Sequence, residues 1–306
     1  MYKDKENKLK VAIIGLGKYG RKRAKAIESI PSLELVATVD PISHGLKICD
    51  HFISIEDIES NIDLYFICTP NNLHIEFCKK LLPQNKIIIC EKPICTKSED
   101  LIILQELYSL HDSSLFMGSN LSYFPSFLEL TSYLAINKIT KFKKIKASIG
   151  INNKSLLSKW SKEKNISGGG TLIDNGVHII QYLLSFLPNL ESTKVELNPS
   201  IIEESAVIKG NSINCPEIII ESSWNRTKEG YAQIEIHTED NLVINADAFA
   251  DFILINSEKK ECETKIPSIE QEILSIINDC HGNSKSSNID QSHKCIDFIL
   301  NCYEIC

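Results

Sequence analysis

The stretch Lys10-Val11-Ala12-Ile13-Ile14-Gly15-Leu16-Gly17-Lys18-Tyr19-Gly20 decides the fold of this chain. Its first five residues form an apolar, β-branched run, which predicts a buried parallel strand. A Gly-x-Gly-x-x-Gly pattern follows at once and opens a helical stretch that Pro31 ends. In such a pattern Gly15 allows the tight turn, Gly17 lets a pyrophosphate approach the backbone, and Gly20 lets helix and strand pack closely. The stretch therefore predicts a dinucleotide-binding turn.

An acidic residue closes the next predicted strand. Leu33–Val39 is a second apolar run, and Asp40 follows it about 20 residues after the glycines, as the dinucleotide fingerprint requires. A carboxylate at this place accepts hydrogen bonds from the adenosine ribose and repels a 2′-phosphate. No arginine follows it in Pro41-Ile42-Ser43-His44. The sequence therefore predicts NAD as the cofactor, in preference to NADP.

Strands and helices continue to alternate up to residue 118. Further strands are predicted over 63–68, 86–90 and 115–118, and helices over 73–82 and 96–111. Such alternation predicts an α/β fold with a doubly wound parallel sheet, whose ligands bind at the carboxyl ends of the strands. We place a dinucleotide-binding Rossmann domain at 1–122. The residues expected to contact its cofactor are Gly15, Gly17, Lys18, Tyr19, Gly20, Asp40, Thr69, Pro70, Asn71, His74 and Glu91. For His74, a capping or packing role is an equal alternative.

The pattern changes from Pro125 onward. A helix over 126–136 precedes strands over 142–151, 205–209, 217–224, 231–238, 242–246 and 252–255. Strands that follow one another without helices predict a mostly antiparallel open sheet. The charged stretch 257–264 is expected to be a loop, and helices over 269–280 and 290–302 close the chain. We assign 123–306 to a domain for substrate binding and oligomerisation. The exposed face of its sheet predicts a homodimer or homotetramer.

A glycine triplet opens the segment with the clearest chemistry. Gly168-Gly169-Gly170 is followed by Asp174 and His178, four residues apart. A helix starting near Thr171 would place these two side chains on one face, one turn apart. A carboxylate and an imidazole so placed could grip two hydroxyls of one substrate, or the acid could orient the base. Together with Glu91-Lys92-Pro93 at a strand end, they point to a dehydrogenase acting on a carbinol.

These motifs together resemble the Gfo/Idh/MocA family of glucose–fructose oxidoreductases, inositol dehydrogenases and rhizopine catabolism proteins. The resemblance runs nearly end to end and rests on residues 15–20, 69–74, 91–93 and 168–178. It implies a Rossmann domain, a second domain with an open sheet, and frequent oligomers paired through that sheet. It also implies that Lys92, Asp174 and His178 meet the substrate. The resemblance, and the need to turn Lys92 sharply from its strand end, predict a cis Lys92–Pro93 peptide.

Three departures from the family pattern concern the substrate. Gln181 stands where a second acid is usual, Ser122 replaces the arginine of a common Asn-x-Arg-Phe-x-Pro segment, and the chain is short in its second half. Sugars, sugar nucleotides and cyclitols therefore all remain compatible. Two other functions also stay open. One is a non-catalytic NAD(H)-binding sensor or regulatory protein, and the other is an epimerase- or lyase-type enzyme that recycles its NAD internally.

Composition narrows the class of protein. The chain has 306 residues, 43% of them hydrophobic, and a formal net charge of -7, which argues against a nucleic-acid surface. No segment has the roughly 18–20 apolar residues of a membrane span. Residues 1–10 lack the apolar region of a signal peptide. Eleven cysteines occur without a Cys-x-x-Cys pair, and no further ligand falls at metal-binding spacing near His178. We expect a cytoplasmic protein with reduced thiols, no metal and a small-molecule partner.

Overall fold

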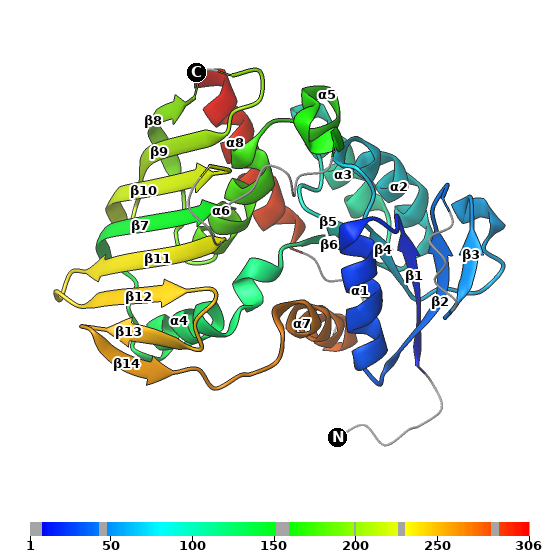
Figure 1. The fold of residues 1–306 in the computed structure, drawn as a ribbon, viewed down its shortest axis with the longest axis horizontal. Coiled ribbons are helices and arrows are strands. Elements are labelled where there is room, and N and C mark those ends of the chain that lie inside the picture. Colours follow the sequence, from blue (N-terminus) through cyan, green and yellow to red (C-terminus); the bar gives the residue numbers. More distant parts are fainter. Residues whose placement is uncertain are drawn as a thin grey trace. The chain divides into compact units, whose positions relative to one another are not determined.

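The structure is a computed structural model that describes residues 8–42, 48–150, 159–198, 200–225, 230–282 and 288–305. The chain forms two compact units (Figure 1). Unit 1 comprises Met1–Cys95, Glu99–Gly118 and Ile269–Ile289, and unit 2 comprises Thr96–Ser98, Ser119–Ser268 and Asp290–Cys306. A single boundary after residue 122 does not describe this division, because the chain returns to unit 1 late in the sequence.

Unit 1 is built on a six-stranded parallel sheet with helices after its strands. The predicted doubly wound parallel sheet is confirmed. In spatial order its strands are β3 (Asp50–Phe52), β2 (Leu33–Val39), β1 (Leu9–Ile14), β4 (Leu64–Ile67), β5 (Ile87–Glu91) and β6 (Ser114–Gly118). Its helices are α1 (Lys18–Ser29), α2 (His74–Leu81), α3 (Ser98–Leu110) and α7 (Ser268–Gly282).

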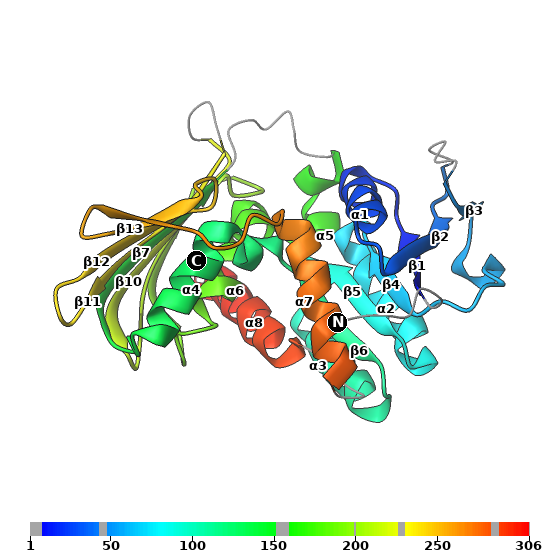
Figure 2. The ribbon, with the colours of Figure 1, turned by 90° about the horizontal axis from the view of Figure 1, so that it is seen from below.

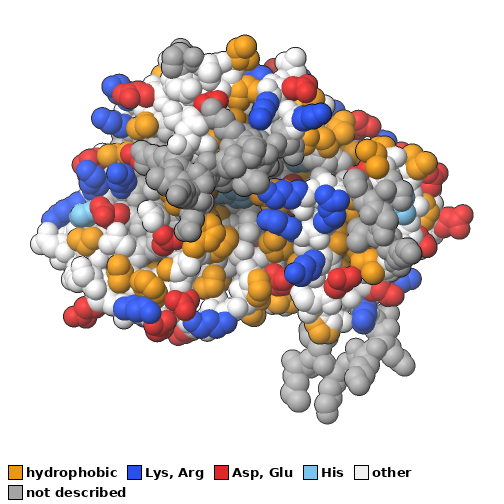
Figure 3. All heavy atoms as spheres, viewed as in Figure 1, with side chains coloured by type: hydrophobic (Ala, Val, Ile, Leu, Met, Phe, Trp, Pro, Cys, Tyr) orange, Lys and Arg blue, Asp and Glu red, His pale blue; other side chains and the backbone are white. Residues whose placement is uncertain are grey.

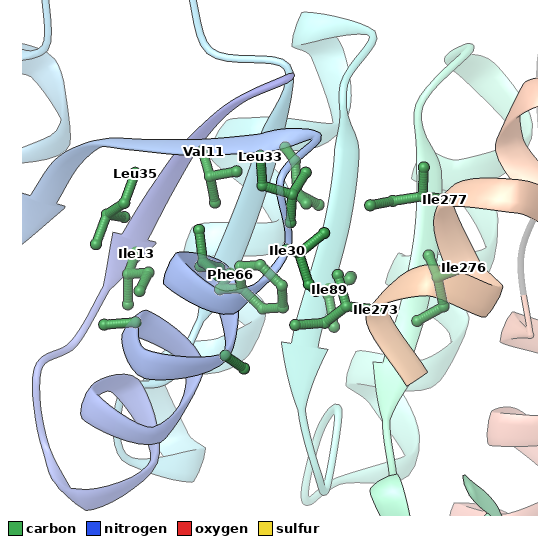
Figure 4. Packing of buried hydrophobic residues seen from close by; sticks show 14 of the residues in the cluster. Val11, Ile13, Ile30, Leu33, Leu35, Phe66, Ile89, Ile273, Ile276 and Ile277 are labelled. Carbon is green, nitrogen blue, oxygen red and sulfur yellow. The ribbon is translucent and has the colours of Figure 1, made fainter. Parts of the chain in front are cut away.

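Apolar side chains of α7 explain why this late helix belongs to unit 1. Ile273, Ile276 and Ile277 are buried and join the core that β1, α1 and β4 form around Phe66 (Figure 4). Each buried isoleucine contributes about 1.5–3 kcal/mol relative to an exposed one. The sequence predicted the helix itself over 269–280. Its assignment to unit 1 depends on a three-dimensional contact more than 150 residues away along the chain, which periodicity cannot reveal.

Three buried charged side chains also link α1, β5 and α7. The Arg23 guanidinium donates from Nε to Glu91 Oε1 at 2.8 Å and from Nη1 to Glu272 Oε2. Its Cζ also lies 5.4 Å from the centroid of the Phe66 ring. Burial alone would lower the pKa of Arg23, but Glu272 and Glu91 raise it above its ordinary value. The three residues therefore hold the end of β5, immediately before Lys92, against two helices.

Unit 2 is built on an eight-stranded sheet that is antiparallel except between β7 and β10 in the described residues. The predicted mostly antiparallel sheet is confirmed. In spatial order its strands are β14 (Glu258–Glu261), β13 (Phe252–Ile255), β12 (Val243–Asp247), β11 (Tyr231–Thr238), β7 (Phe142–Gly150), β10 (Cys215–Ser223), β9 (Ser205–Ser212) and β8 (Glu191–Leu197). Residue 151, the predicted end of β7, lies outside the described residues.

Helices cover one face of this sheet (Figure 2). They are α4 (Pro125–Ile136), α6 (Val177–Leu183) and α8 (Ile289–Ile305), and the short α5 (Lys164–Ser167) precedes the glycine triplet. Ile218 and Ile220 of β10 are each 1% exposed, whereas Ile219 between them is half-buried. On the strand's outer side Glu217 pairs with Lys144 at 2.7 Å and Glu221 with Lys146 at 3.7 Å. The outer face thus carries charged pairs, and the expected oligomer through it stays a prediction.

Three strands differ from the sequence-based expectation. The stretch 257–264, expected to be a loop, contains the edge strand β14, which pairs with β13. Its sequence Glu258-Lys259-Lys260-Glu261 lacks apolar alternation because an edge strand needs only one neighbour and is often charged. The strands β3 and β8 were not predicted either. β8 is mainly polar and lies at the other edge of the sheet.

Removing one member of the buried triad should destabilise unit 1. We expect Glu272→Ala to lower the free energy of unfolding by about 3–5 kcal/mol, because the buried Arg23 loses one of the two carboxylate partners it has among the described residues. Denaturant unfolding followed by circular dichroism measures the change. Lys80→Ala is the control, since it removes an exposed ion pair with Glu56 and should change the stability little. Equal effects of the two substitutions would show that the triad does not stabilise the unit.

Candidate functional site

The glycine loop of unit 1 has the geometry of a dinucleotide cradle. Gly15 adopts a φ of +91°, and a Cβ there would lie 2.7 Å from the carbonyl carbon of Cys68. A Cβ at Gly20 would overlap the carbonyl oxygen of Gly15, so α1 can start close to β1 only with a glycine there. A Cβ at Gly17, by contrast, would meet nothing within 4 Å. The loop thus packs tightly on its inner side and leaves space at Gly17, which fits a bound pyrophosphate.

Asp40 lies beside this loop at the end of β2. Its Oδ2 accepts a hydrogen bond from the Leu16 N–H at 2.7 Å, and its Oδ1 accepts one from the Ile42 N–H at 2.9 Å. A carboxylate at the end of the second strand is the group that hydrogen-bonds the adenosine ribose in dinucleotide-binding folds. The predicted acid is therefore fixed against the glycine loop. Ser43 and His44, part of the segment from which NAD preference was inferred, lie outside the described residues.

Basic side chains surround the start of α1 and were largely missed by the sequence analysis. Lys18, Arg21, Lys22 and Lys25 are all exposed, and Figure 3 shows lysine and arginine side chains gathered over α1. Partial burial and then the charge of Lys18 lower the pKa of Lys22, whose Nζ lies 5.0 Å from the centroid of the Tyr19 ring. Cations at a helix N-terminus oppose its dipole, and a bound pyrophosphate would relieve this repulsion.

The loop after β4 brings together several predicted contacts of the cofactor. Asn71 is buried at the start of a 3-10 turn that Pro70 precedes. The Thr69 hydroxyl has no hydrogen-bond partner among the described residues although its oxygen is buried. A buried hydroxyl without a partner is costly, so a ligand that supplies one would stabilise this loop. These residues fit a dinucleotide at the carboxyl end of the sheet.

His74 links this loop to the turn after β5. Its ring is fully buried, with Nδ1 at 2.7 Å from the Pro93 carbonyl oxygen and Nε2 at 3.0 Å from that of Thr69. Burial lowers its pKa, and the two carbonyl groups partly oppose that effect. Both nitrogens thus face the backbone, which favours the packing role over a direct contact with the cofactor.

The turn after β5 carries Lys92. Lys92 is buried at 9% exposure, and the peptide that joins it to Pro93 is cis, as predicted. Glu91, expected to contact the cofactor, has its Oε1 bonded to Arg23. The geometry therefore gives Glu91 a clear part in holding the strand end that presents Lys92.

In unit 2 the acid and the histidine lie on a π turn followed by α6. The π turn covers Leu172–Gly176, where a regular α-helix from Thr171 was expected. A Cβ at Gly176 would lie 2.9 Å from Cδ1 of Leu172, so a larger residue there would shift the end of that leucine side chain. Turns of this kind, with an additional residue, often occur at functional sites. The expected α-helical spacing of Asp174 and His178 is corrected accordingly.

Two residues that the sequence analysis missed hold this pair. Ser119 Oγ lies 2.9 Å from Nδ1 of His178, and the Trp224 indole N–H donates to Oδ2 of Asp174 at 3.2 Å. Ser119 follows β6 and Trp224 follows β10, and both are buried. No local motif marks either residue, because each reaches the pair only through the fold of unit 2. Lys92, the third residue that the family resemblance implies, belongs to unit 1.

Gln181 occupies the place of the family's second acid, one turn after His178. Its side chain is 5% exposed, and its Oε1 is buried without a hydrogen-bond partner in the described part of the chain. A neutral amide brings no negative charge to the turn that follows the histidine. His178 thus has Asp174 as the one acid that the motif supplies.

Within the described ranges, no group of three or more His, Cys, Asp or Glu side chains could hold a metal ion. Among the helices of those ranges, none is both long and apolar enough to cross a membrane.

Comparison with known proteins identifies the fold. Residues 9–119 match the model of the oxidoreductase family with an NAD-binding Rossmann fold, GFO_IDH_MocA. Glucose-6-phosphate 3-dehydrogenase of Bacillus subtilis (strain 168) is 26% identical over 207 residues, which cover 63% of this chain. That alignment covers 58% of the enzyme, so the chain spans less than two thirds of this relative's length.

Two further relatives extend beyond the first domain. Inositol 2-dehydrogenase of Rhizobium meliloti (strain 1021) is 21% identical over 252 residues, covering 75% of this chain and 73% of that protein. The structure of levoglucosan dehydrogenase in complex with NADH superposes with a TM-score of 0.85 at 15% identity, covering 98% of each chain. Residues 9–119 therefore match the NAD-binding Rossmann fold of the Gfo/Idh/MocA oxidoreductases, and the chain beyond them is similar in sequence to inositol 2-dehydrogenase and in fold to levoglucosan dehydrogenase.

Proposed function

We propose that this protein is an NAD-dependent oxidoreductase that interconverts a secondary hydroxyl and a ketone on a sugar, sugar nucleotide or cyclitol. The observation that carries the proposal is the pair Asp174 and His178. Each is held by a side chain from elsewhere in unit 2, in a chain whose other unit is an NAD-binding fold. A histidine held by a specific partner, four residues after an acid that is also held, is an arrangement that suits a general acid–base group.

His178 is the proposed acid–base residue. With Nδ1 directed to Ser119, the tautomer that donates from Nδ1 to the serine oxygen makes Nε2 the basic nitrogen. Nε2 takes the proton of the substrate hydroxyl during oxidation and returns it during reduction. General acid–base assistance of this kind contributes about 10²–10⁴-fold to the rate.

Lys92 is proposed, from the family resemblance, to donate a hydrogen bond to the same oxygen. An ammonium group there stabilises the negative charge that develops on that oxygen. The nicotinamide of bound NAD supplies or accepts the hydride. The glycine loop and the N-terminus of α1 would hold its pyrophosphate, and Asp40 its adenosine ribose. Asp174 would bind a neighbouring hydroxyl of the substrate, with its carboxylate kept in place by Trp224.

A screen of sugars, sugar nucleotides and cyclitols with NAD and NADP, followed by NADH or NADPH absorbance, tests the reaction. Net reduction of NAD by one of them supports the dehydrogenase. Substrate conversion without net NADH would instead indicate an enzyme that recycles its NAD. Binding of NAD without conversion of any compound would instead indicate the non-catalytic sensor, the other alternative that the sequence leaves open.

His178→Asn should lower kcat by about 10²-fold or more while leaving NAD affinity nearly unchanged. Asparagine can hydrogen-bond the substrate but cannot take its proton near neutral pH, and the cofactor-binding motifs lie in the other unit. Steady-state kinetics and fluorescence titration with NAD measure the two quantities. Combined with Lys92→Ala, the loss should be smaller than the sum of the two single effects, because both groups act on one oxygen. Unchanged turnover in His178→Asn would assign the base to another residue.

Asp40→Ser should weaken NAD binding by about tenfold and bring the affinity for NADP closer to that for NAD. The substitution removes an acceptor for the ribose hydroxyls and a negative charge that repels a 2′-phosphate. Fluorescence titrations with both cofactors measure the ratio. Asp50→Ser, which removes an equal charge from an exposed residue of β3, is the control and should leave the ratio unchanged. If the parent already prefers NADP, the assignment of Asp40 is wrong.

Trp224→Phe should raise KM for the substrate by about tenfold with a smaller change in kcat. Phenylalanine keeps an aromatic ring but loses the indole N–H that holds Asp174, and a bond to a charged group is worth about 1.5–3 kcal/mol. Trp160→Phe changes the chain's other tryptophan and should leave KM as it is. An equal effect of both substitutions would show that the indole bond does not position Asp174.

A further inference from the structure

One buried carboxylate binds the start of the segment that carries Asp174 and His178. Glu203, on the connection between β8 and β9, is 6% exposed. Its carboxylate accepts hydrogen bonds from the Gly170 N–H at 3.0 and 2.9 Å and from the Leu172 N–H at 3.0 Å. Its backbone oxygen accepts a bond from the Thr171 N–H at 2.9 Å. Three consecutive amide groups thus bind one residue.

We propose that Glu203, together with Tyr303 of α8, is a positioning residue for the acid–base segment. The first amide groups of any helix have no partner within that helix. Thr171 provides no side-chain cap here, because its hydroxyl bonds instead to Ser222 at 2.8 Å. Glu203 takes the place of the local cap, and its negative charge is favourable at a helix N-terminus.

Tyr303 secures the carboxylate from the far end of the chain. Its hydroxyl donates to Glu203 Oε1 at 2.7 Å. Burial and then the neighbouring carboxylate raise the pKa of Tyr303 above its ordinary value, so the phenol keeps its proton at neutral pH. All the partners described for this carboxylate are hydrogen-bond donors, as an ionised carboxylate requires.

The glycine triplet makes room for this arrangement. A Cβ at Gly170 would overlap the backbone oxygen of Glu203, and a Cβ at Gly169 would overlap the Tyr303 hydroxyl. The triplet is therefore a tightly packed junction in which the absence of side chains lets a carboxylate and a phenol approach the backbone. The triplet is thus held by close packing on two of its three glycines.

α8 also contacts the other end of the same segment. Cys295 Sγ lies 3.5 Å from the Val177 carbonyl oxygen, and Gln291 Nε2 donates to the Gln181 carbonyl oxygen at 2.7 Å. Together with Tyr303, these contacts fix the segment from residue 170 to residue 181 along one helix. The Asp174 N–H bonds to the Gly170 carbonyl oxygen at 3.0 Å, so a shift at residue 170 reaches the acid directly.

The inference rests on the proposed function for its catalytic consequence, and its structural part can be tested separately. In Tyr303→Phe, we expect hydrogen–deuterium exchange of the peptide covering residues 168–176 to accelerate by about tenfold, because a bond to a charged acceptor is lost. We also expect kcat per NAD-binding site to fall by about tenfold, with NAD affinity unchanged. Mass spectrometry, steady-state kinetics and NAD titration measure these quantities.

Tyr182→Phe is the matched control. It removes a buried hydroxyl that bonds to the Phe127 carbonyl oxygen at 2.9 Å on α4, away from the glycine triplet. Exchange of the peptide covering residues 168–176 should stay as in the parent. In a second series, Glu203→Asp should retain more of kcat than Glu203→Gln, because aspartate keeps the charge and both acceptor oxygens while glutamine replaces one of them with a donor.

Three outcomes would overturn the inference. Unchanged exchange in Tyr303→Phe would show that Tyr303 does not secure the segment. Faster exchange with unchanged kcat would show that the contact stabilises the fold without positioning the acid–base pair. Equal activity of Glu203→Asp and Glu203→Gln would exclude a requirement for the carboxylate. Absence of turnover in the parent would contradict the proposed function, and exchange would still decide whether Tyr303 secures the segment.

Discussion

The hydrogen bonds from the amide groups of residues 170–172 to Glu203 are the constraint on which the acid–base segment depends. Backbone N–H groups at the start of a buried helix must find acceptors, because leaving them without partners costs about 1–3 kcal/mol each. Here one residue satisfies three of them. The glycine triplet and the closing helix α8 can both be understood from that requirement, since the triplet lets the carboxylate reach the backbone and Tyr303 of α8 keeps it there.

In both units a helix follows a glycine-rich segment and its first N–H groups need acceptors, but the acceptors differ. In unit 1, α1 begins at a glycine with no side-chain cap, and its first turn has no acid but carries Lys18. Such a helix start is prepared for an anion that the chain does not supply, which is how a Rossmann fold receives a pyrophosphate. In unit 2 the chain supplies the anion itself. A glycine-rich sequence before a helix therefore indicates a ligand site in one unit and a tightly packed junction in the other.

This contrast explains how far the sequence could predict the molecule. Apart from β3, the strands of the parallel sheet are encoded by local patterns, as are its glycine loop and Asp40, and the predicted parallel sheet is confirmed. The partners Ser119, Trp224 and Glu203 lie 59, 50 and 31–33 residues from the groups they bind, so a local sequence pattern cannot predict them. The histidines show the same limit. His74 and His178 each follow a recognisable motif, but only the fold shows that His74 has both ring nitrogens on backbone carbonyls.

Buried carboxylates act together with apolar side chains to fix the unit that each closing helix joins. The helices α7 and α8 are neighbours in sequence, yet α7 belongs to unit 1 and α8 contributes to unit 2. Glu272 of α7 meets its partner in Arg23, whereas Tyr303 of α8 donates to Glu203. A buried charge or acceptor that loses its partner costs several kcal/mol, which is more than a misplaced apolar contact of similar size. The polar pairs therefore provide the specificity that the apolar pattern lacks.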